Sequence, residues 1–366
     1  MAARRPLALP DFPWDQLVPF AETARSHADG MVDLSVGSPV DDTPDVVREA
    51  LAAATDAHSY PLTAGSPALR EAIVAWFAER RNVDDLSVAN VLPTIGSKEL
   101  IAMLPLFLGI RAGDVVVHPS IAYPTYAIGA AIAGADALAT DDPAEWPGNT
   151  RLIWVNSPGN PDGSIRGVEW LRTAVARARE LGAIIVSDEC YAEFVWNSDE
   201  PSVSILDPRV IEGKRNSVLA VYSLSKQSNL AGYRAGIVAG CSDLIDEILA
   251  VRKHAGLLPP APVQSAMIAA LGDHAHVAVQ KARYEKRRAV LKPALESSGY
   301  RIDNSEGGLY LWATKGVDCW ESLAELASLG ILAAPGAFYG DGAHEHVRIA
   351  LTASDTAIEK AAARLV

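Results

Sequence analysis

Lys226 stands in the serine-rich segment SLSKQSNLAGYR (223–234), directly after the apolar run 217–223. An apolar run of this length predicts a buried strand, and an ammonium group near its end is costly to bury unless its charge is used or its pKa falls. A lysine so placed can form a Schiff base with a carbonyl group, and Arg234 can bind an anion beside it. The alternative is an exposed lysine in a polar turn.

Two other polar segments also follow apolar runs. Asp188 and Tyr191 lie in SDECY (187–191), and Asn160 lies in NSPGNPDG (156–163). An aspartate at the carboxyl end of a buried strand can pair with a cationic ring nitrogen, and a nearby tyrosine can donate a hydrogen bond. The alternatives are a helix N-cap for Asp188 and a simple tight turn for the Asn160 segment.

A fourth segment, TIGSKEL (94–100), lies between a predicted strand and a predicted helix. Its glycine and the unpaired N–H groups at the start of the helix favour a phosphate group. It is not a nucleotide-binding loop, because GxxxxGK[ST] occurs nowhere in the sequence and no GxGxxG follows a strand.

The elements that must position these groups alternate between short β-branched runs and longer helical patterns. We expect strands at 90–94, 114–118, 151–156, 183–187, 217–223 and 235–239, and helices near 97–108, 123–134 and 168–181. This alternation predicts an α/β fold with a mostly parallel sheet and helices on both faces. Ligands of such sheets bind beyond the carboxyl ends of the strands, which is where the four segments lie.

The remainder of the chain has a different character. The segment 242–292 is helical and is interrupted by prolines near residue 260, and it precedes expected strands at 308–313 and 346–351 and a helix at 320–328. This mixture predicts a second, smaller α+β domain.

Composition limits the classes of function. The 366 residues suggest about two domains at roughly 150 residues each, and 49% hydrophobic residues are enough for a core. A net charge of −13 argues against nucleic acid or an anionic membrane as the main partner. Three scattered cysteines fit a reducing compartment. With no signal-peptide pattern and no apolar run near the roughly 18 residues that span a bilayer, we expect a soluble, cytoplasmic protein.

In their order and spacing these segments resemble the fold type I pyridoxal-phosphate enzymes, and among them the class I/II aminotransferases. The resemblance covers nearly the whole chain: VGSP (36–39), YPLTAGSPALREAI (60–73), GSKE (96–99), YPTY (123–126), NSPGNPDG, SDECY, SLSKxxxLAGYRAG and VRIAL (347–351). It implies a seven-stranded mixed sheet, with a large cofactor-binding domain at 41–250. It also implies an N-terminal arm and small domain made of 1–40 and 251–366.

The resemblance also implies roles for single residues around pyridoxal 5′-phosphate. Lys226 would carry the cofactor, Asp188 would hold its ring nitrogen protonated, and Tyr123 would stack on its ring. Tyr191 and Asn160 would donate to its phenolic oxygen. The phosphate ligands would be Ser97, Lys98, Ser223 and Arg234, together with Tyr60 from the partner subunit of a homodimer with shared sites. Arg348 would bind the substrate α-carboxylate, with Gly37 and Asn160 beside it.

The implied reaction is amino transfer between glutamate or 2-oxoglutarate and a second amino acid or 2-oxo acid. The start LPDFPWDQL and the elements GLYLWA and PGAFYG resemble the actinobacterial N-succinyldiaminopimelate aminotransferases of lysine biosynthesis. Aspartate or aromatic aminotransferases remain alternatives, and Arg252 and Lys253 are candidates for the second cation that an aspartate enzyme needs. A carbon–sulfur β-lyase on the same fold also stays open. A regulator fused to a DNA-binding domain does not suit the acidic charge.

Some residues with suggestive types are expected to have ordinary roles. His344 and His346 resemble a metal pair, but we expect them, like His274 and His276, to lie in solvated turns. No metal is predicted. Phe12 and Trp14 are expected to form an arm that packs over the domain or its partner, near the entrance of the site.

Overall fold

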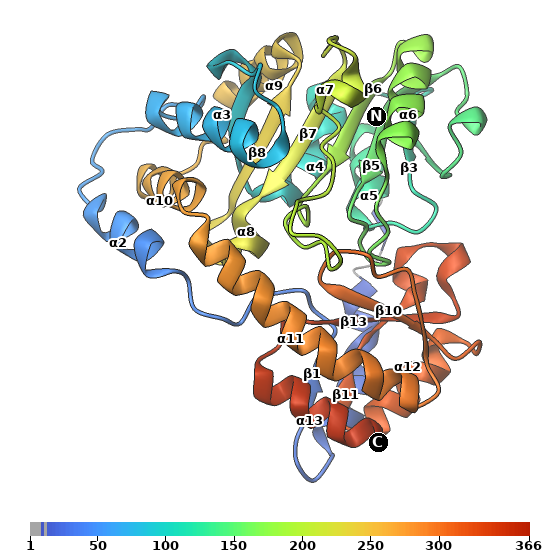
Figure 1. The fold of residues 1–366 in the computed structure, drawn as a ribbon. Coiled ribbons are helices and arrows are strands. Elements are labelled where there is room, and N and C mark those ends of the chain that lie inside the picture. The colour runs from blue at the N-terminus through green and yellow to red at the C-terminus, as the bar shows by residue number, and fades with distance from the viewer. Residues whose placement is uncertain (1–8, 11–12) are drawn as a thin grey trace, which may run out of the picture.

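The computed structural model describes residues 9–10 and 13–366. Its centre is a seven-stranded sheet in the order β2-β8-β7-β6-β5-β3-β4 (Figure 1). The strands are β2 (Val91–Ile95), β3 (Val115–His118), β4 (Asp136–Ala139), β5 (Thr150–Asn156), β6 (Ile184–Asp188), β7 (Val218–Ser223) and β8 (Ala235–Gly240). Only β8 runs antiparallel to its neighbours. The predicted mixed, mostly parallel sheet is therefore confirmed.

The six strands expected from the sequence all form, and each end lies within one residue of its prediction. The edge strand β4 was not expected. Its sequence, DALA, is short and mostly exposed, so it lacks the apolar run that marked the other strands.

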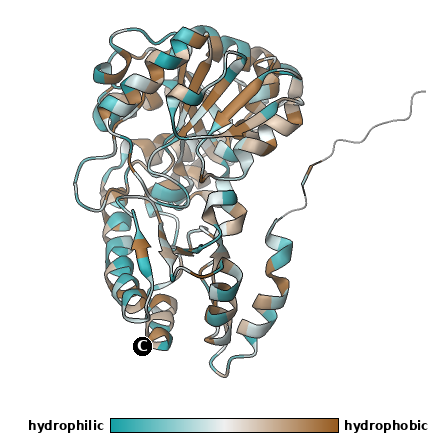
Figure 2. Ribbon diagram, turned by 90° about the vertical axis from the view of Figure 1, so that its right-hand side faces the viewer, coloured by the Kyte–Doolittle hydropathy of each residue, from teal (hydrophilic) through white to brown (hydrophobic). Residues whose placement is uncertain are grey.

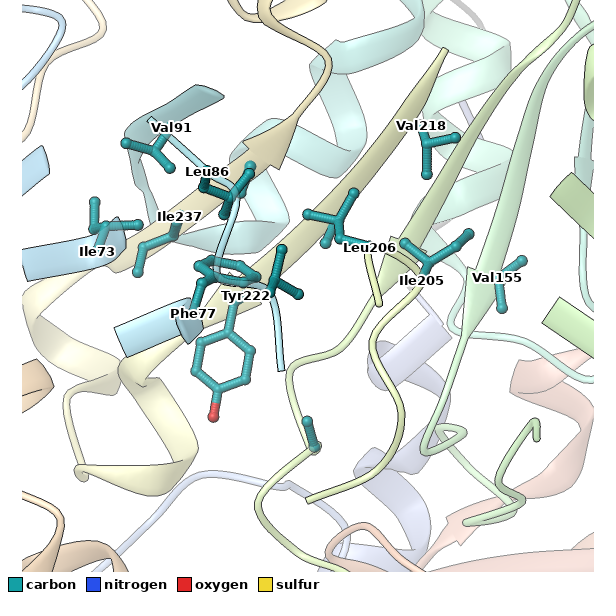
Figure 3. Packing of buried hydrophobic residues seen from close by; sticks show 14 of the residues in the cluster. Ile73, Phe77, Leu86, Val91, Val155, Ile205, Leu206, Val218, Tyr222 and Ile237 are labelled. Atoms are coloured by element: carbon teal, nitrogen blue, oxygen red, sulfur yellow. The ribbon is translucent and has the colours of Figure 1, made fainter. Parts of the chain in front are cut away.

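Helices cover both faces of the sheet, so that the inner strands bury both sets of alternating side chains. In β5, Ile153 and Val155 face a core shared with α3 (Pro67–Arg81), α6 (Val168–Leu181) and α10 (Ala261–Gly272). Leu152 and Trp154 face the opposite core, with α4 (Gly96–Phe107), α5 (Thr125–Ala133) and α9 (Ser242–Ala255). Figure 3 shows the first of these cores and Figure 2 the apolar strands between more polar helices.

The smaller α+β part is built on a four-stranded antiparallel sheet in the order β12-β13-β10-β9. Its strands are β9 (Arg301–Asp303), β10 (Tyr310–Thr314), β12 (Ala334–Pro335) and β13 (His346–Ala350). The helices α11 (Ala275–Ser297), α12 (Cys319–Ser328) and α13 (Asp355–Leu365) pack on it around their own apolar cluster.

The N-terminal segment joins the smaller part. The strand β1 (Val32–Asp33) pairs with β11 (Ile331–Leu332), and α1 (Val18–Arg25) packs on α12. By contrast, α10 packs on α2 (Asp45–Ala53) and α3, and Met267 lies in the core of the large sheet. The helix α10 therefore packs with the large sheet, and we propose that the two parts divide near the start of α11, whereas the boundary expected from the sequence was residue 250 (Figure 1). A helical pattern alone does not say which of two sheets the helix will cover.

Within the described part of the chain, no helix combines the length and the apolar character needed to cross a bilayer.

Candidate active site

Three neighbouring parallel strands end in polar residues, Asn156 on β5, Asp188 on β6 and Ser223 on β7. Beyond these ends lies a cavity of about 1140 Å³ between the two parts of the molecule. Its lining includes eleven of the twelve residues that the sequence assigned to the site: Gly37, Ser97, Lys98, Tyr123, Asn160, Asp188, Tyr191, Ser223, Lys226, Arg234 and Arg348. The exception is Tyr60.

Asp188 is a buried carboxylate that two groups hold in place. The Tyr126 hydroxyl donates to Oδ2 over 2.9 Å, and the Cys190 N–H donates to Oδ1 over 3.2 Å. Burial raises the pKa of Asp188 above its usual value, although the bonds from Cys190 and Tyr126 oppose the shift. Residues 189–207 form turns and no helix, so the helix-cap alternative for Asp188 is wrong.

Tyr126 was not predicted as part of this arrangement. It lies on α5, is fully buried, and stacks on Trp154 of β5 with ring centroids 5.1 Å apart. The repeated tyrosine in YPTY was the one sequence feature that could have indicated it, because residues 123 and 126 would share a face of the helix expected at 123–134. In the structure, α5 begins only at Thr125.

Lys226 lies in the short helix α8 (Leu224–Gln227), whose start is capped by the Ser223 hydroxyl. The lysine is half-buried and lines the cavity, where its Nζ donates to the Gly37 carbonyl oxygen. An exposed lysine in a polar turn is therefore excluded.

The start of α4 and Arg234 form a cradle for an anion. Ser97 and Lys98 occupy the first turn of α4, where N–H groups lack helical partners. Gly96 has φ +72°, and a Cβ atom there would come within 2.4 Å of Arg234 Nη2. The glycine thus gives the helix start its turn and leaves room for the guanidinium.

Arg348 is 3% exposed and lies between two aromatic rings, 4.0 Å from the Tyr310 centroid and 5.1 Å from that of Tyr339. Its Nη1 donates to Asn160 Oδ1 over 3.0 Å and its Nη2 to the Ser35 carbonyl over 2.6 Å. No carboxylate among the described residues pairs with it. A buried guanidinium without a counter-ion is costly, so the cavity is suited to receive a substrate anion here.

Tyr310 is a further site residue that the sequence motifs did not indicate. Its hydroxyl lies 3.0 Å from that of Tyr191, and both phenols are buried. A Cβ atom on Gly37 would lie 1.9 Å from the Tyr310 oxygen, which explains the need for glycine at position 37. The segment GLYLWA predicted the strand, but a strand pattern does not say which of its side chains reaches a distant cavity.

The outer wall of the cavity is aromatic. Trp14 packs against Phe338 with centroids 5.2 Å apart, and Trp320 meets the same ring at 5.9 Å. All three line the cavity, so the N-terminal arm reaches the site at Trp14. Phe12 lies outside the described residues.

Several expected residues do not enter the cavity. Tyr60 is 98% exposed, so it does not pack against its own chain. Arg252 is buried and pairs with Glu99 at 2.9 Å, while Lys253 is exposed elsewhere on α9. The cations of the described lining are Lys98, Lys226, Arg234 and Arg348, and neither candidate for a second substrate cation is among them.

Two of the histidines differ from expectation. His276 is largely buried rather than solvated, and contacts the Ser228 hydroxyl at 2.8 Å and Asp273 at 3.1 Å. His346 contacts Asp303 at 2.8 Å and stacks on Trp312. In both cases the fold supplies a partner from a segment that is not visible in the local pattern.

Comparison with known proteins identifies the family. Residues 29–365 match the model of the aminotransferases of class I and II. The chain belongs to this family. Class I and II aminotransferases depend on pyridoxal 5′-phosphate, and their reaction converts amino acids and 2-oxo acids into one another.

Individual aminotransferases resemble this chain over nearly its full length. The 4-dedimethylamino-4-oxo-anhydrotetracycline transaminase OxyQ of Streptomyces rimosus is 54% identical, covering 98% of this chain and 99% of that protein. A probable aminotransferase of Mycobacterium tuberculosis is 52% identical, covering 98% of this chain and 85% of that protein. A solved probable N-succinyldiaminopimelate aminotransferase from Thermus thermophilus is 26% identical with a TM-score of 0.86, covering 97% and 99%.

The residues of this aminotransferase fit its cofactor. Asp188 is buried without a described cationic partner, which suits a protonated ring nitrogen. The cradle at Gly96 and Arg234 suits a phosphate dianion. The amine of Lys226 faces the same cavity, as a covalent attachment to the cofactor requires.

Proposed function

We propose that this aminotransferase moves an amino group between glutamate or 2-oxoglutarate and a second amino acid or 2-oxo acid. The observation that carries the proposal is the buried, carboxylate-free Arg348 in the same cavity as Lys226. A planar guanidinium of this kind binds a carboxylate bidentately. It would hold the α-carboxylate of either substrate and so bring the substrate Cα toward the lysine.

The cofactor would be held by three groups of residues. Asp188 would pair with its ring nitrogen, and Tyr123 would stack on the ring. Tyr191 and Asn160 would donate to its phenolic oxygen, Asn160 through Nδ2 because Arg348 occupies its Oδ1. The phosphate would be bound by Ser97, Lys98, Ser223 and Arg234.

When bound, pyridoxal phosphate supplies an electron sink for the charge that develops at the substrate Cα. Lys226 would take the proton from Cα as a general base, and return a proton as a general acid. The Gly37 carbonyl, to which Nζ donates, would orient the amine. The aromatic outer wall would exclude water from the reacting atoms.

For the second substrate, the sequence motifs and the similarity to the Thermus thermophilus protein favour N-succinyl-LL-2,6-diaminopimelate, as in lysine biosynthesis. A second candidate is a bulky aromatic ketone. It is favoured by the wall of Trp14, Phe338 and Trp320, and by the similarity to OxyQ, a transaminase of an oxo-anhydrotetracycline. A homodimer in the cytoplasm is part of the same proposal.

A panel of amino donors tests the proposal. Glutamate, N-succinyl-diaminopimelate, aspartate, phenylalanine and a bulky aromatic amine would each be added to the loaded enzyme, and the change in cofactor absorbance recorded. We expect glutamate and one second donor to convert the cofactor to its amine form, and Lys226→Ala to leave it unconverted with every compound. Release of pyruvate from cystathionine without an added oxo acid would instead establish the β-lyase alternative.

A further inference from the structure

We propose that Tyr310 is a positioning residue of the site, whose hydroxyl donates to the Tyr191 oxygen and thereby strengthens the hydrogen bond that Tyr191 donates into the cavity. This inference rests on the proposed role of Tyr191 toward the phenolic oxygen of the cofactor. It adds a residue that neither the sequence motifs nor the family resemblance assigned.

The contact is built by two distant parts of the chain. Tyr310 lies on β10, two residues before Trp312, which pairs with Arg348 of β13. Tyr191 lies in the turn after β6. Their oxygens are 3.0 Å apart and their rings meet edge to face, with centroids 5.7 Å apart at 74°. With 3% and 6% of their surfaces exposed, the two phenols have little water to bond instead.

The nearby charges and the number of available protons indicate which phenol donates. Burial raises the pKa of Tyr310, but the charges of Arg348 and Lys226 outweigh it and the net shift is downward. Burial raises the pKa of Tyr191, and the neighbouring Tyr310 raises it further. The hydroxyl of each tyrosine has only one proton to donate. If Tyr191 donates its proton to the cofactor, the contact of 3.0 Å requires that Tyr310 donates and Tyr191 accepts, and the lowered pKa of Tyr310 fits this direction.

A phenol that accepts a hydrogen bond becomes a stronger donor through its own O–H, because consecutive hydrogen bonds polarise one another. Tyr191 would therefore donate more strongly to the phenolic oxygen of the cofactor. A strong donor there withdraws electron density from the phenolic oxygen and so weakens the binding of the proton that this oxygen shares with the Lys226 nitrogen. That proton is then lost at a lower pH, which is visible in the absorbance of the bound cofactor.

The first test is a pH titration of cofactor absorbance in the loaded full-length enzyme. Tyr310→Phe keeps the ring against Arg348 and removes only the hydroxyl. We expect its midpoint to rise by roughly 0.3–1 pH unit, in the same direction as Tyr191→Phe but by less. Because Tyr310 acts through Tyr191, the double variant should have the midpoint of Tyr191→Phe alone.

Tyr339→Phe is the matched control. Tyr339 is also buried against Arg348, yet its hydroxyl has no partner among the described residues. We expect its loss to leave the midpoint in place. A wild-type midpoint in Tyr310→Phe, or shifts from positions 310 and 191 that simply add, would overturn the proposal.

A second measurement is independent of catalysis and of bound cofactor. In the cofactor-free chain, ultraviolet titration of the phenols should show one tyrosine that ionises at lower pH than the rest. It should disappear in Tyr310→Phe and persist in Tyr339→Phe. If it persists in Tyr310→Phe, Tyr310 is not the acidic member of the pair and the assigned direction of donation is wrong, whatever the donor panel shows.

Discussion

At the scale of single residues, the site holds two charged side chains in buried positions, where removal from water costs free energy. Asp188 and Arg348 are both nearly inaccessible, and neither has an oppositely charged partner among the described residues. Hydrogen bonds from Tyr126 and the Cys190 N–H hold the carboxylate, while Asn160 and the Ser35 carbonyl hold the guanidinium. Such groups stabilise the fold poorly and bind complementary ligands well.

Asp188→Asn keeps the size of the side chain but removes the charge that would stabilise a protonated ring nitrogen. We expect the barrier to rise by roughly 3 kcal/mol, which is more than a hundredfold loss in turnover. Single-turnover rates with glutamate would measure it. Tyr126→Phe, which removes one donor to the carboxylate, should cost about tenfold or less. Near-normal turnover in Asp188→Asn would mean that the carboxylate has only a structural role.

At the scale of elements, the junction between β2 and α4 combines a special backbone conformation with close packing. Gly96 needs a positive φ to start the helix and must lack a side chain to admit Arg234. Gly109, just after the same helix, has nearly the same φ of +70°, but a Cβ atom there would have nothing within 4 Å. Substitution of Gly109 would therefore show the effect of backbone strain alone, whereas substitution of Gly96 would add the collision with Arg234.

Gly96→Ala should weaken cofactor retention about tenfold or more, because its methyl group displaces a proposed phosphate ligand. Gly109→Ala should cost about 1 kcal/mol in the free energy of unfolding and leave cofactor affinity unchanged. Equilibrium dialysis of the cofactor and denaturant unfolding of both variants would measure these effects. Equal affinity in the two variants would show that the cradle does not bind the phosphate.

At the scale of the whole molecule, Tyr60 is exposed and lies outside the described lining of the cavity, and we propose that a second copy of the chain completes the site. Tyr60 and Leu62 are 98% and 61% exposed, which is unusual for large apolar side chains near each other. A second copy of the chain would bury them. We propose that Tyr60 then donates to the phosphate in the partner's cavity, a charge-assisted bond worth on the order of 1.5–3 kcal/mol.

Tyr60→Phe should therefore reduce cofactor affinity about tenfold or more and leave the free energy of unfolding of the chain unchanged. Mixing of subunits tests the sharing directly, at a cofactor concentration too low to load Tyr60→Phe alone. When Tyr60→Phe subunits are combined with Lys226→Ala subunits, the hybrid dimers should be active. If the sites are shared, one site of each hybrid carries both substitutions and the other site carries neither. No recovery after confirmed exchange would mean that Tyr60 does not reach across.

The strands of the central sheet and the polar segments that follow most of them could be predicted from the sequence alone. Apolar runs report burial on both faces, and polar residues directly after such runs must lie at the carboxyl edge of the sheet. For this reason the segments of Lys226, Asp188 and Asn160 could be placed at one edge of the sheet from the order of residues along the chain, whereas the role of each residue was implied by the family resemblance. The short, exposed β4 could not be predicted, because it lacks an apolar run.

Contacts between distant side chains could not be predicted and became visible only in the folded chain. Tyr191 and Tyr310 are 119 residues apart, and Arg348 and Asn160 are 188 residues apart. The position of α10 on the large sheet, the burial of His276 and the contact of Tyr126 with Asp188 depend in the same way on segments far along the chain. A local pattern shows the spacing of apolar side chains within one segment and therefore which element forms and which face it buries. Contacts between distant residues depend instead on how complete elements pack against one another.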